Sequence, residues 1–211
     1  SEMCIRDRVW GGPAWHNGRV YVGSADKNLY ALDATTGEQE WSFNAGGAIY
    51  CAPWVDEEVV YFGSLDNKVY AVRADNGEEV WTFSTGNWVW ASPVKVQDTL
   101  YVASLDRSLY ALDAATGQLR WQAEAGDMIT AQPAIADGAV FFSAHGAGVY
   151  AVNADTGAEL WRYPREGVLV VMSSPEVADG SVYINADDGK LYVLSAETGD
   201  LQWEVAPGGT E

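Results

Sequence analysis

Short runs of alternating apolar and polar residues return about every 40 residues along the chain. The clearest unit spans residues 91–124 and reads, in order, ASPVKV, TLYVAS, LYALD and QLRWQAE. Alternation rich in β-branched and aromatic residues is typical of strands, whereas the i, i+3, i+4 spacing of an amphipathic helix is not found. Each unit is therefore predicted to hold four short antiparallel strands, and the chain to be all-β.

One tryptophan closes each unit, which makes the period easy to measure. The interval between successive members is 40, 40, 40 and 42 residues. The five are Trp41, Trp81, Trp121, Trp161 and Trp203. Four strands in a unit of this length are typical of one blade of a β-propeller. We therefore expect five four-stranded blades.

A glycine stands four residues before each of these tryptophans, between the third and fourth strands. The five are Gly37, Gly77, Gly117, Gly157 and Gly199. Glycine suits the positive φ that such a turn requires. A blade cannot bury both of its apolar faces alone, so we expect each indole to dock on the turn of the next blade, burying roughly 150–250 Å².

Between the second and third strands of the fifth unit, Asp188-Gly189 favours a two-residue hairpin.

The pattern A-x-D-x-x-T-G-x-x-x-W is complete at residues 31–41 and again at residues 111–121. It resembles the tryptophan-docking motif of the PQQ-like β-propeller family, which includes quinoprotein alcohol dehydrogenases and the BamB-type assembly proteins. The other three copies depart from the pattern at one or two positions each, namely Arg73, Asn76, Asn153, Val193 and Ser195. The resemblance covers residues 9–206, nearly the whole chain.

The repeat divides the chain into one array flanked by two short segments. We expect an irregular leader at 1–8 and a tail at 207–211. The predicted blades are 9–45, 46–85, 86–125, 126–165 and 166–206. Propellers of the family that the motif resembles close with seven or eight blades, so five blades favour an incomplete ring, although propellers of roughly four to eight blades occur and a closed ring of five is the alternative. An open arc would expose apolar surface on its two end blades and favour self-association there.

Charge and composition narrow the classes of partner. The formal net charge is −18, from 30 Asp and Glu against 12 Lys and Arg, and such a surface repels nucleic acid. No run approaches the roughly 20 apolar residues of a membrane helix. Cys4 and Cys51 are too few for a disulfide framework or a four-cysteine zinc site. His16 and His145 lie in predicted turns without a nucleophile at a recognisable spacing.

The segments that lead into the first strand of each blade are the candidate binding site. In propellers of this type they approach one mouth of the central channel. Aromatic, methionine and threonine side chains stand three residues before each proline: Trp10, Tyr50, Trp90, Thr130 and Met172. Trp88 and Met128 lie two residues earlier. Arg165 lies in the stretch 162–174, which leads into blade five and is two residues longer than its equivalents. These side chains either form a surface for a peptide or flat ligand, or pack between blades.

We expect a non-enzymatic interaction or scaffold module that binds a protein or peptide and needs no cofactor. The family resemblance implies an extracytoplasmic location. Two alternatives stay open: a fragment of a quinoprotein dehydrogenase, which would use PQQ with calcium, and the sensor domain of a larger surface protein. The dehydrogenases carry a vicinal disulfide and a calcium site of Glu, Asn and Asp, and no Cys-Cys pair occurs here.

Overall fold

The computed structural model describes residues 9–164 and 166–206. These residues form twenty strands in five four-stranded antiparallel sheets, and no helix occurs among them. In every sheet the strands follow one another in chain order, so each sheet is a meander. The all-β class and the five four-stranded blades expected from the repeat are confirmed. The leader at 1–8, the tail at 207–211 and Arg165 lie outside the described residues.

The strands have nearly the same lengths from blade to blade. Blade one contains β1 (Ala14–His16), β2 (Arg19–Gly23), β3 (Asn28–Asp33) and β4 (Gln39–Asn44). Blade two contains β5 (Trp54–Val55), β6 (Val59–Ser64), β7 (Lys68–Arg73) and β8 (Glu79–Ser84). Blade three contains β9 (Val94–Val96), β10 (Thr99–Ala103), β11 (Ser108–Asp113) and β12 (Leu119–Glu124).

The last two blades keep this arrangement. Blade four contains β13 (Ala134–Ala136), β14 (Ala139–Ala144), β15 (Gly148–Asn153) and β16 (Glu159–Tyr163). Blade five contains β17 (Glu176–Ala178), β18 (Ser181–Asn185), β19 (Leu191–Ser195) and β20 (Leu201–Val205). The first strand of every blade has three residues or fewer, because the proline before it removes a backbone donor at the strand's start.

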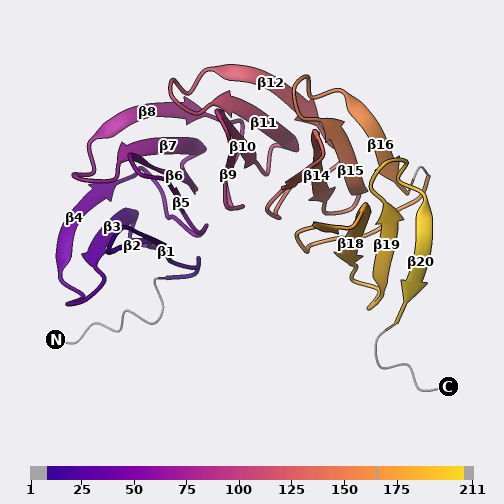
Figure 1. Ribbon diagram of the computed structural model, residues 1–211, viewed down its shortest axis with the longest axis horizontal. Coiled ribbons are helices and arrows are strands. Elements are labelled where there is room, and N and C mark those ends of the chain that lie inside the picture. Colours follow the sequence, from indigo (N-terminus) through magenta and orange to yellow (C-terminus); the bar gives the residue numbers. More distant parts are fainter. Residues whose placement is uncertain (1–8, 165, 207–211) are drawn as a thin grey trace.

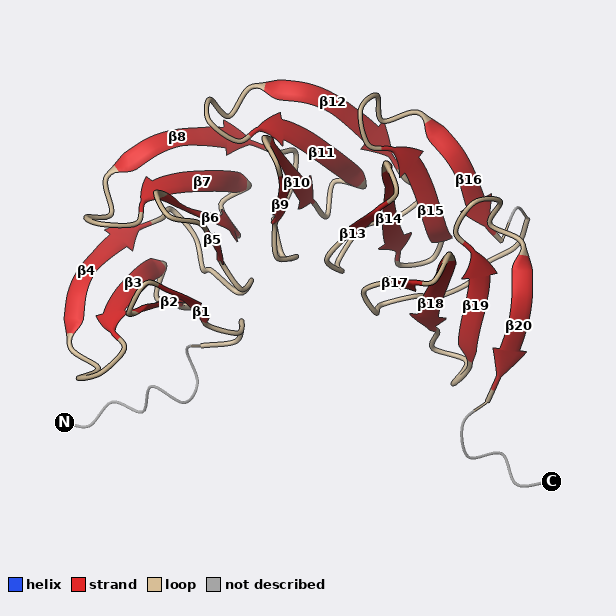
Figure 2. Cartoon of the chain, in the orientation of Figure 1, coloured by secondary structure: helices blue, strands red, loops and turns tan. Residues whose placement is uncertain are grey.

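The five blades stand side by side in an open arc (Figure 1). Figure 2 shows the short first strands on the concave side and the fourth strands on the convex side. Blade one and blade five occupy the two ends and do not meet (Figure 1). The incomplete ring expected from five blades is therefore what the described residues form.

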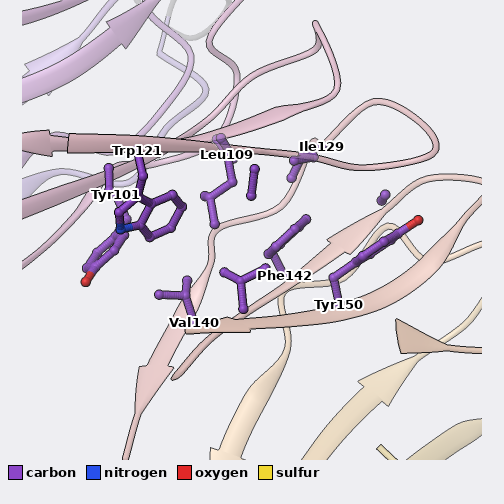
Figure 3. Close-up of a cluster of buried hydrophobic side chains, with 13 residues drawn as sticks. Tyr101, Leu109, Trp121, Ile129, Val140, Phe142 and Tyr150 are labelled. Carbon is purple, nitrogen blue, oxygen red and sulfur yellow. The ribbon is translucent and has the colours of Figure 1, made fainter. Parts of the chain in front are cut away.

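The core lies between the blades as four separate apolar layers. In the layer between blades three and four, Tyr101, Leu109 and Trp121 face Val140 and Phe142 (Figure 3). The same strand positions build the other three layers. Each internal blade therefore has both of its faces covered, and the two end blades each have one face that no other described blade covers.

No helix in the described part of the chain is long and apolar enough to cross a membrane.

Candidate functional site

The tryptophan-docking contact repeats at the four places where two blades meet. Each indole Nε1 donates to the carbonyl oxygen of an alanine in the next blade, at 2.9–3.2 Å. The pairs are Trp41 with Ala74, Trp81 with Ala114, Trp121 with Ala154, and Trp161 with Ala196. These four side chains are only 6–9% exposed. Each contact therefore buries an aromatic ring and also gives its N–H a hydrogen-bond acceptor.

The glycine of each turn forms the floor on which the indole of the preceding blade lies. A Cβ added to Gly77, Gly117, Gly157 or Gly199 would stand 2.6 Å from that ring. All four glycines also have positive φ, between 71° and 75°. Two independent constraints therefore require glycine here, the backbone conformation and the close approach of the indole.

The two end blades break this pattern. Trp203 is 47% exposed on β20, because no described blade lies beyond it, and this corrects the expectation that all five indoles dock. Gly37 keeps a positive φ of 73°, yet nothing lies within 4 Å of an added Cβ. One half of a docking contact is thus exposed at each end of the arc.

The candidate mouth is formed by the segments that cross between blades. Each segment is anchored by one fully buried apolar side chain: Ile49, Val89, Ile129 and Val171. The segments are also tied to one another, since Ser92 Oγ accepts from the backbone N–H of Ala52 at 3.0 Å. Ser174 Oγ accepts in the same way from Gln132 at 3.1 Å. The residues that follow each anchor therefore have fixed positions on the concave side.

Four of the predicted mouth residues come together around one shallow cavity of about 260 Å³. Tyr50, Trp90, Thr130 and Met172 all line it. Trp10 joins them through Tyr50, with ring centroids 5.6 Å apart, and Tyr50 in turn lies 5.1 Å from Trp90. Trp10 is 69% exposed and Met172 55% exposed, so neither is packed between blades. We call this group the aromatic mouth.

Trp88 and Met128 do not line this cavity. Both side chains are exposed on their crossing segments. The backbone N–H of Leu105 donates to the carbonyl oxygen of Trp88, and the backbone N–H of His145 donates to that of Met128. The predicted mouth is therefore smaller than the sequence suggested. Arg165 cannot be placed, because it lies outside the described residues.

The carboxylates of the turns between second and third strands have local structural partners. Asp106 Oδ2 accepts from the Gly86 N–H at 2.6 Å and from the Tyr110 hydroxyl at 2.7 Å. Burial, reinforced by this carboxylate, raises the pKa of Tyr110 to about 12. Asp66 makes the corresponding bonds to Gly46 and Tyr70. These acidic groups hold the crossing segment against the turn.

Among the described residues, His16, His145 and Cys51 have no partner placed as a catalytic dyad or triad requires. His145 Nδ1 stands 3.8 Å from Asp127 Oδ2, and His16 is the last residue of β1. Cys51 is fully buried beside Gly63, and burial raises the pKa of its thiol to about 11. A buried, protonated thiol is a poor nucleophile.

The described blades were searched for clusters of metal-ligating Asp, Glu, His and Cys side chains. Residues 9–164 and 166–206 contain no group of three Asp, Glu, His or Cys side chains that could hold a metal ion. Calcium takes six to eight oxygen ligands, and the turn carboxylates described above are already engaged by tyrosine and backbone donors.

A larger hollow of about 610 Å³ between blades two and three was not anticipated from the sequence. Its charged lining includes Lys95 and Arg120. Lys95 pairs with Asp56 at 3.0 Å and Arg120 with Asp113 at 2.7 Å. Because Lys95 and Arg120 are already paired inside the hollow, the hollow is a weaker candidate binding site than the aromatic mouth. Only the spatial packing of two blades brings these residues together, so no local sequence signal marks them.

Five four-stranded blades joined by docked tryptophans define a PQQ-like β-propeller. The family model described as "outer membrane protein assembly factor BamB" matches residues 5–87 and 66–211, so the chain belongs to this family. No curated protein is close enough in sequence to match.

Several solved structures share the fold at low identity. BamB from Moraxella catarrhalis has 20% identity and a TM-score of 0.82, over 93% of this chain and 61% of that one. The computationally designed Ika8 protein also has 20% identity and a TM-score of 0.82, over 96% of this chain and 63% of that one. Quinohemoprotein alcohol dehydrogenase from Comamonas testosteroni has 15% identity and a TM-score of 0.83, over 94% and 43% respectively. The chain thus spans less than two thirds of each of these relatives.

Proposed function

We propose that this chain is a non-enzymatic, extracytoplasmic interaction module whose aromatic mouth binds an extended segment of a partner protein. The observation that carries the proposal is the contact series from Trp10 through Tyr50 to Trp90, which stays partly open to solvent. Large exposed aromatic side chains with few rotatable bonds are the usual anchors of protein recognition. The family model that matches this chain is described as an outer membrane protein assembly factor, which agrees with a role in binding another protein.

The surroundings of the mouth favour a peptide over a small polar ligand. The cavity is open and shallow, and Met172 at its edge is a flexible apolar side chain that adapts to different partner side chains. The negative net charge favours a partner segment with basic residues.

Peptide selection tests the proposal directly. A library of ten-residue peptides displayed on phage is selected on the 211-residue chain, and the selected peptides are titrated by calorimetry. Trp90→Ala should weaken binding roughly tenfold or more, as expected for the loss of an anchor residue. Trp203→Ala is the matched control, since this indole is also exposed but lies on the outermost strand of blade five. Equal weakening by both variants would remove the mouth from the proposal.

The dehydrogenase alternative has its own experiment. Adding PQQ and Ca²⁺ to the chain should give no alcohol- or sugar-dependent reduction of a dye, because no three-ligand group stands among the described residues. Turnover that a chelator abolishes would overturn the non-enzymatic part of the proposal. The peptide experiment would still decide the role of the mouth.

A further inference from the structure

The first strands of blades three, four and five border a further cavity, of about 270 Å³. These strands, β9, β13 and β17, lie on the concave side of the arc (Figure 2). Val94, Val96 and Ile135 give the cavity aliphatic walls, and the prolines before β13 and β17 complete them. Val96 is 39% exposed, so the apolar lining is open to solvent. We call this cavity the apolar groove.

The apolar groove is continuous with the aromatic mouth. Gln132 and Ser174 line both cavities. The backbone N–H of Gln132 donates to Ser174 Oγ at 3.1 Å, and this bond fixes the junction between them. Along the chain the groove residues follow the mouth residues, as Val94 follows Trp90 by four positions. The groove therefore lies beyond the mouth, in the direction in which the first strands run.

The apolar character of the groove comes from the sequences of these particular blades and is not a property of every repeat. In blade two, Trp54 holds the position of Val94 and packs into the apolar layer between blades two and three. Asp56 holds the position of Val96 and pairs with Lys95. A groove with aliphatic walls thus requires the valines that blade three carries.

One carboxylate stands at the edge of the groove. Among the described residues that line it, Glu176 alone is charged, and it is the exposed first residue of β17. A carboxylate beside apolar walls suits a lysine or arginine, whose methylene stem covers the walls while its charged end meets the carboxylate.

We infer that an extended partner segment held by the aromatic mouth continues into the apolar groove, where it places an aliphatic side chain between β9 and β13 and a lysine or arginine beside Glu176. This inference rests on the proposed function and specifies the chemistry of the partner. An extended chain advances about 3.3 Å per residue, as the neighbouring strands do. The aliphatic residue should therefore stand about three to five positions from the residue that contacts Trp90.

A polar side chain in the groove tests the inference. The probes are the ten-residue peptides selected by phage display on the 211-residue chain, titrated by calorimetry. Val96→Asn places an amide where blade two carries Asp56, and it should weaken peptide binding roughly fivefold or more, because the aliphatic contact is lost. Unchanged binding would overturn the inference.

Ala178→Asn is the matched control. Ala178 is the exposed last residue of β17, as Val96 is of β9, and it does not line the groove. This variant should bind within twofold of the original chain. Because both positions are exposed, the urea midpoints of the two variants should match the original, which separates lost binding from lost folding.

A double-mutant cycle identifies the peptide side chain that occupies the groove. Replacing the aliphatic residue of a selected peptide with alanine should weaken binding to the original chain by a factor similar to that of Val96→Asn. The two changes together should add less than twofold to either alone, since both remove one contact. Losses that multiply independently would place the side chain elsewhere and overturn the inference.

Glu176→Gln tests the basic residue. For a peptide with lysine or arginine next to the aliphatic residue, the variant should bind roughly threefold more weakly at 10 mM NaCl, and the difference should disappear at 1 M NaCl. A difference that does not depend on salt would contradict the pairing of that residue with Glu176.

The proposed function and this inference fail in different ways. If Trp90→Ala and Trp203→Ala weaken binding equally, the mouth is not the binding site and both proposals fall. If Trp90→Ala weakens binding and Val96→Asn does not, the mouth stands and the groove is excluded.

Discussion

Gly37 and Gly77 occupy the same turn of neighbouring blades, yet they are under different constraints. Both have positive φ, 73° and 75°. The indole of Trp41 packs against Gly77, whereas nothing lies within 4 Å of a Cβ added to Gly37. Their sequence motifs cannot distinguish them, because the difference comes from whether another blade lies alongside.

Replacing each of these glycines by alanine should separate backbone strain from docking. Gly37→Ala should cost about 1 kcal/mol, the usual penalty of a left-handed conformation for a residue with Cβ. Gly77→Ala should cost roughly 1–3 kcal/mol more, because the Cβ would stand 2.6 Å from the ring of Trp41 and force it to move. Urea unfolding of both variants measures this difference. Equal losses would mean that the indole does not rest on the glycine.

Asp113 shows how a turn carboxylate contributes to stability. Its Oδ2 accepts from Arg120 and its Oδ1 from Thr116, and the Arg120 bond is the main reason that the pKa of Asp113 falls to about 2. A carboxyl group with a lowered folded pKa stabilises the protein above its unfolded pKa of about 4, and the contribution is lost as the pH falls through 2. The Asp113 side chain is 31% exposed and its Arg120 partner 39%, so solvent screens the pair and the effect is small.

Asp113→Asn tests this contribution. Asn153 caps the same turn of blade four and accepts from Thr156 at 3.0 Å, so the amide keeps the turn. Between pH 6 and pH 2.5 the urea midpoint of the Asn variant should fall less than that of the original chain, since the variant has no carboxyl to protonate there. An identical fall in both proteins would contradict the shifted pKa.

At the scale of strands and blades, the docked tryptophan joins the fourth strand of one blade to the turn of the next. Trp121→Ala removes a buried ring and its hydrogen bond to Ala154, and should cost roughly 3–5 kcal/mol. Trp15→Ala and Trp203→Ala remove exposed rings and should each cost below about 1 kcal/mol. Urea midpoints of the three variants give the comparison. Similar small shifts in all three would show that docking contributes little.

The strands could be predicted from the sequence because each depends on local information. Alternation selects strand over helix, and the glycine before each tryptophan marks the turn between the third and fourth strands. The Asp188-Gly189 turn was predicted less well. Ala186 pairs with Lys190, so the loop has three residues and not two, and Gly189 occupies its left-handed position. Lys27, Asn67 and Arg107 adopt the same conformation without glycine. The dipeptide alone therefore did not define the loop length.

The candidate site could be predicted only in part, because the sequence pattern carries local information and not the packing between blades. The period brought Tyr50, Trp90, Thr130 and Met172 to equivalent positions, and in space they line one cavity. The period could not show that Trp88 and Met128 lie away from it, nor that Lys95 and Arg120 meet in a hollow between blades. Those relations depend on how neighbouring blades pack, which the repeat does not encode.

At the scale of the whole molecule, charge and the open arc act together. A net charge of −18 on 211 residues makes the folded chain repel itself. Most charged side chains lie on turns and on the convex fourth strands, while the stabilising apolar layers lie between blades. Repulsion between blades therefore opposes the contacts that hold the arc, and the weakest layer limits its stability.

Salt should relieve this repulsion and raise the melting temperature. The Debye length falls from about 30 Å at 0.01 M to about 8 Å at 0.15 M, so most of the rise should occur below about 0.2 M NaCl, where screening changes most. Thermal melts followed by circular dichroism from 10 mM to 1 M NaCl measure it. Choline chloride is the control, because a screening effect depends on ionic strength and not on the identity of the cation. A melting temperature that falls steadily with salt would mean that attractive ion pairs, such as Lys95 with Asp56, outweigh the net repulsion.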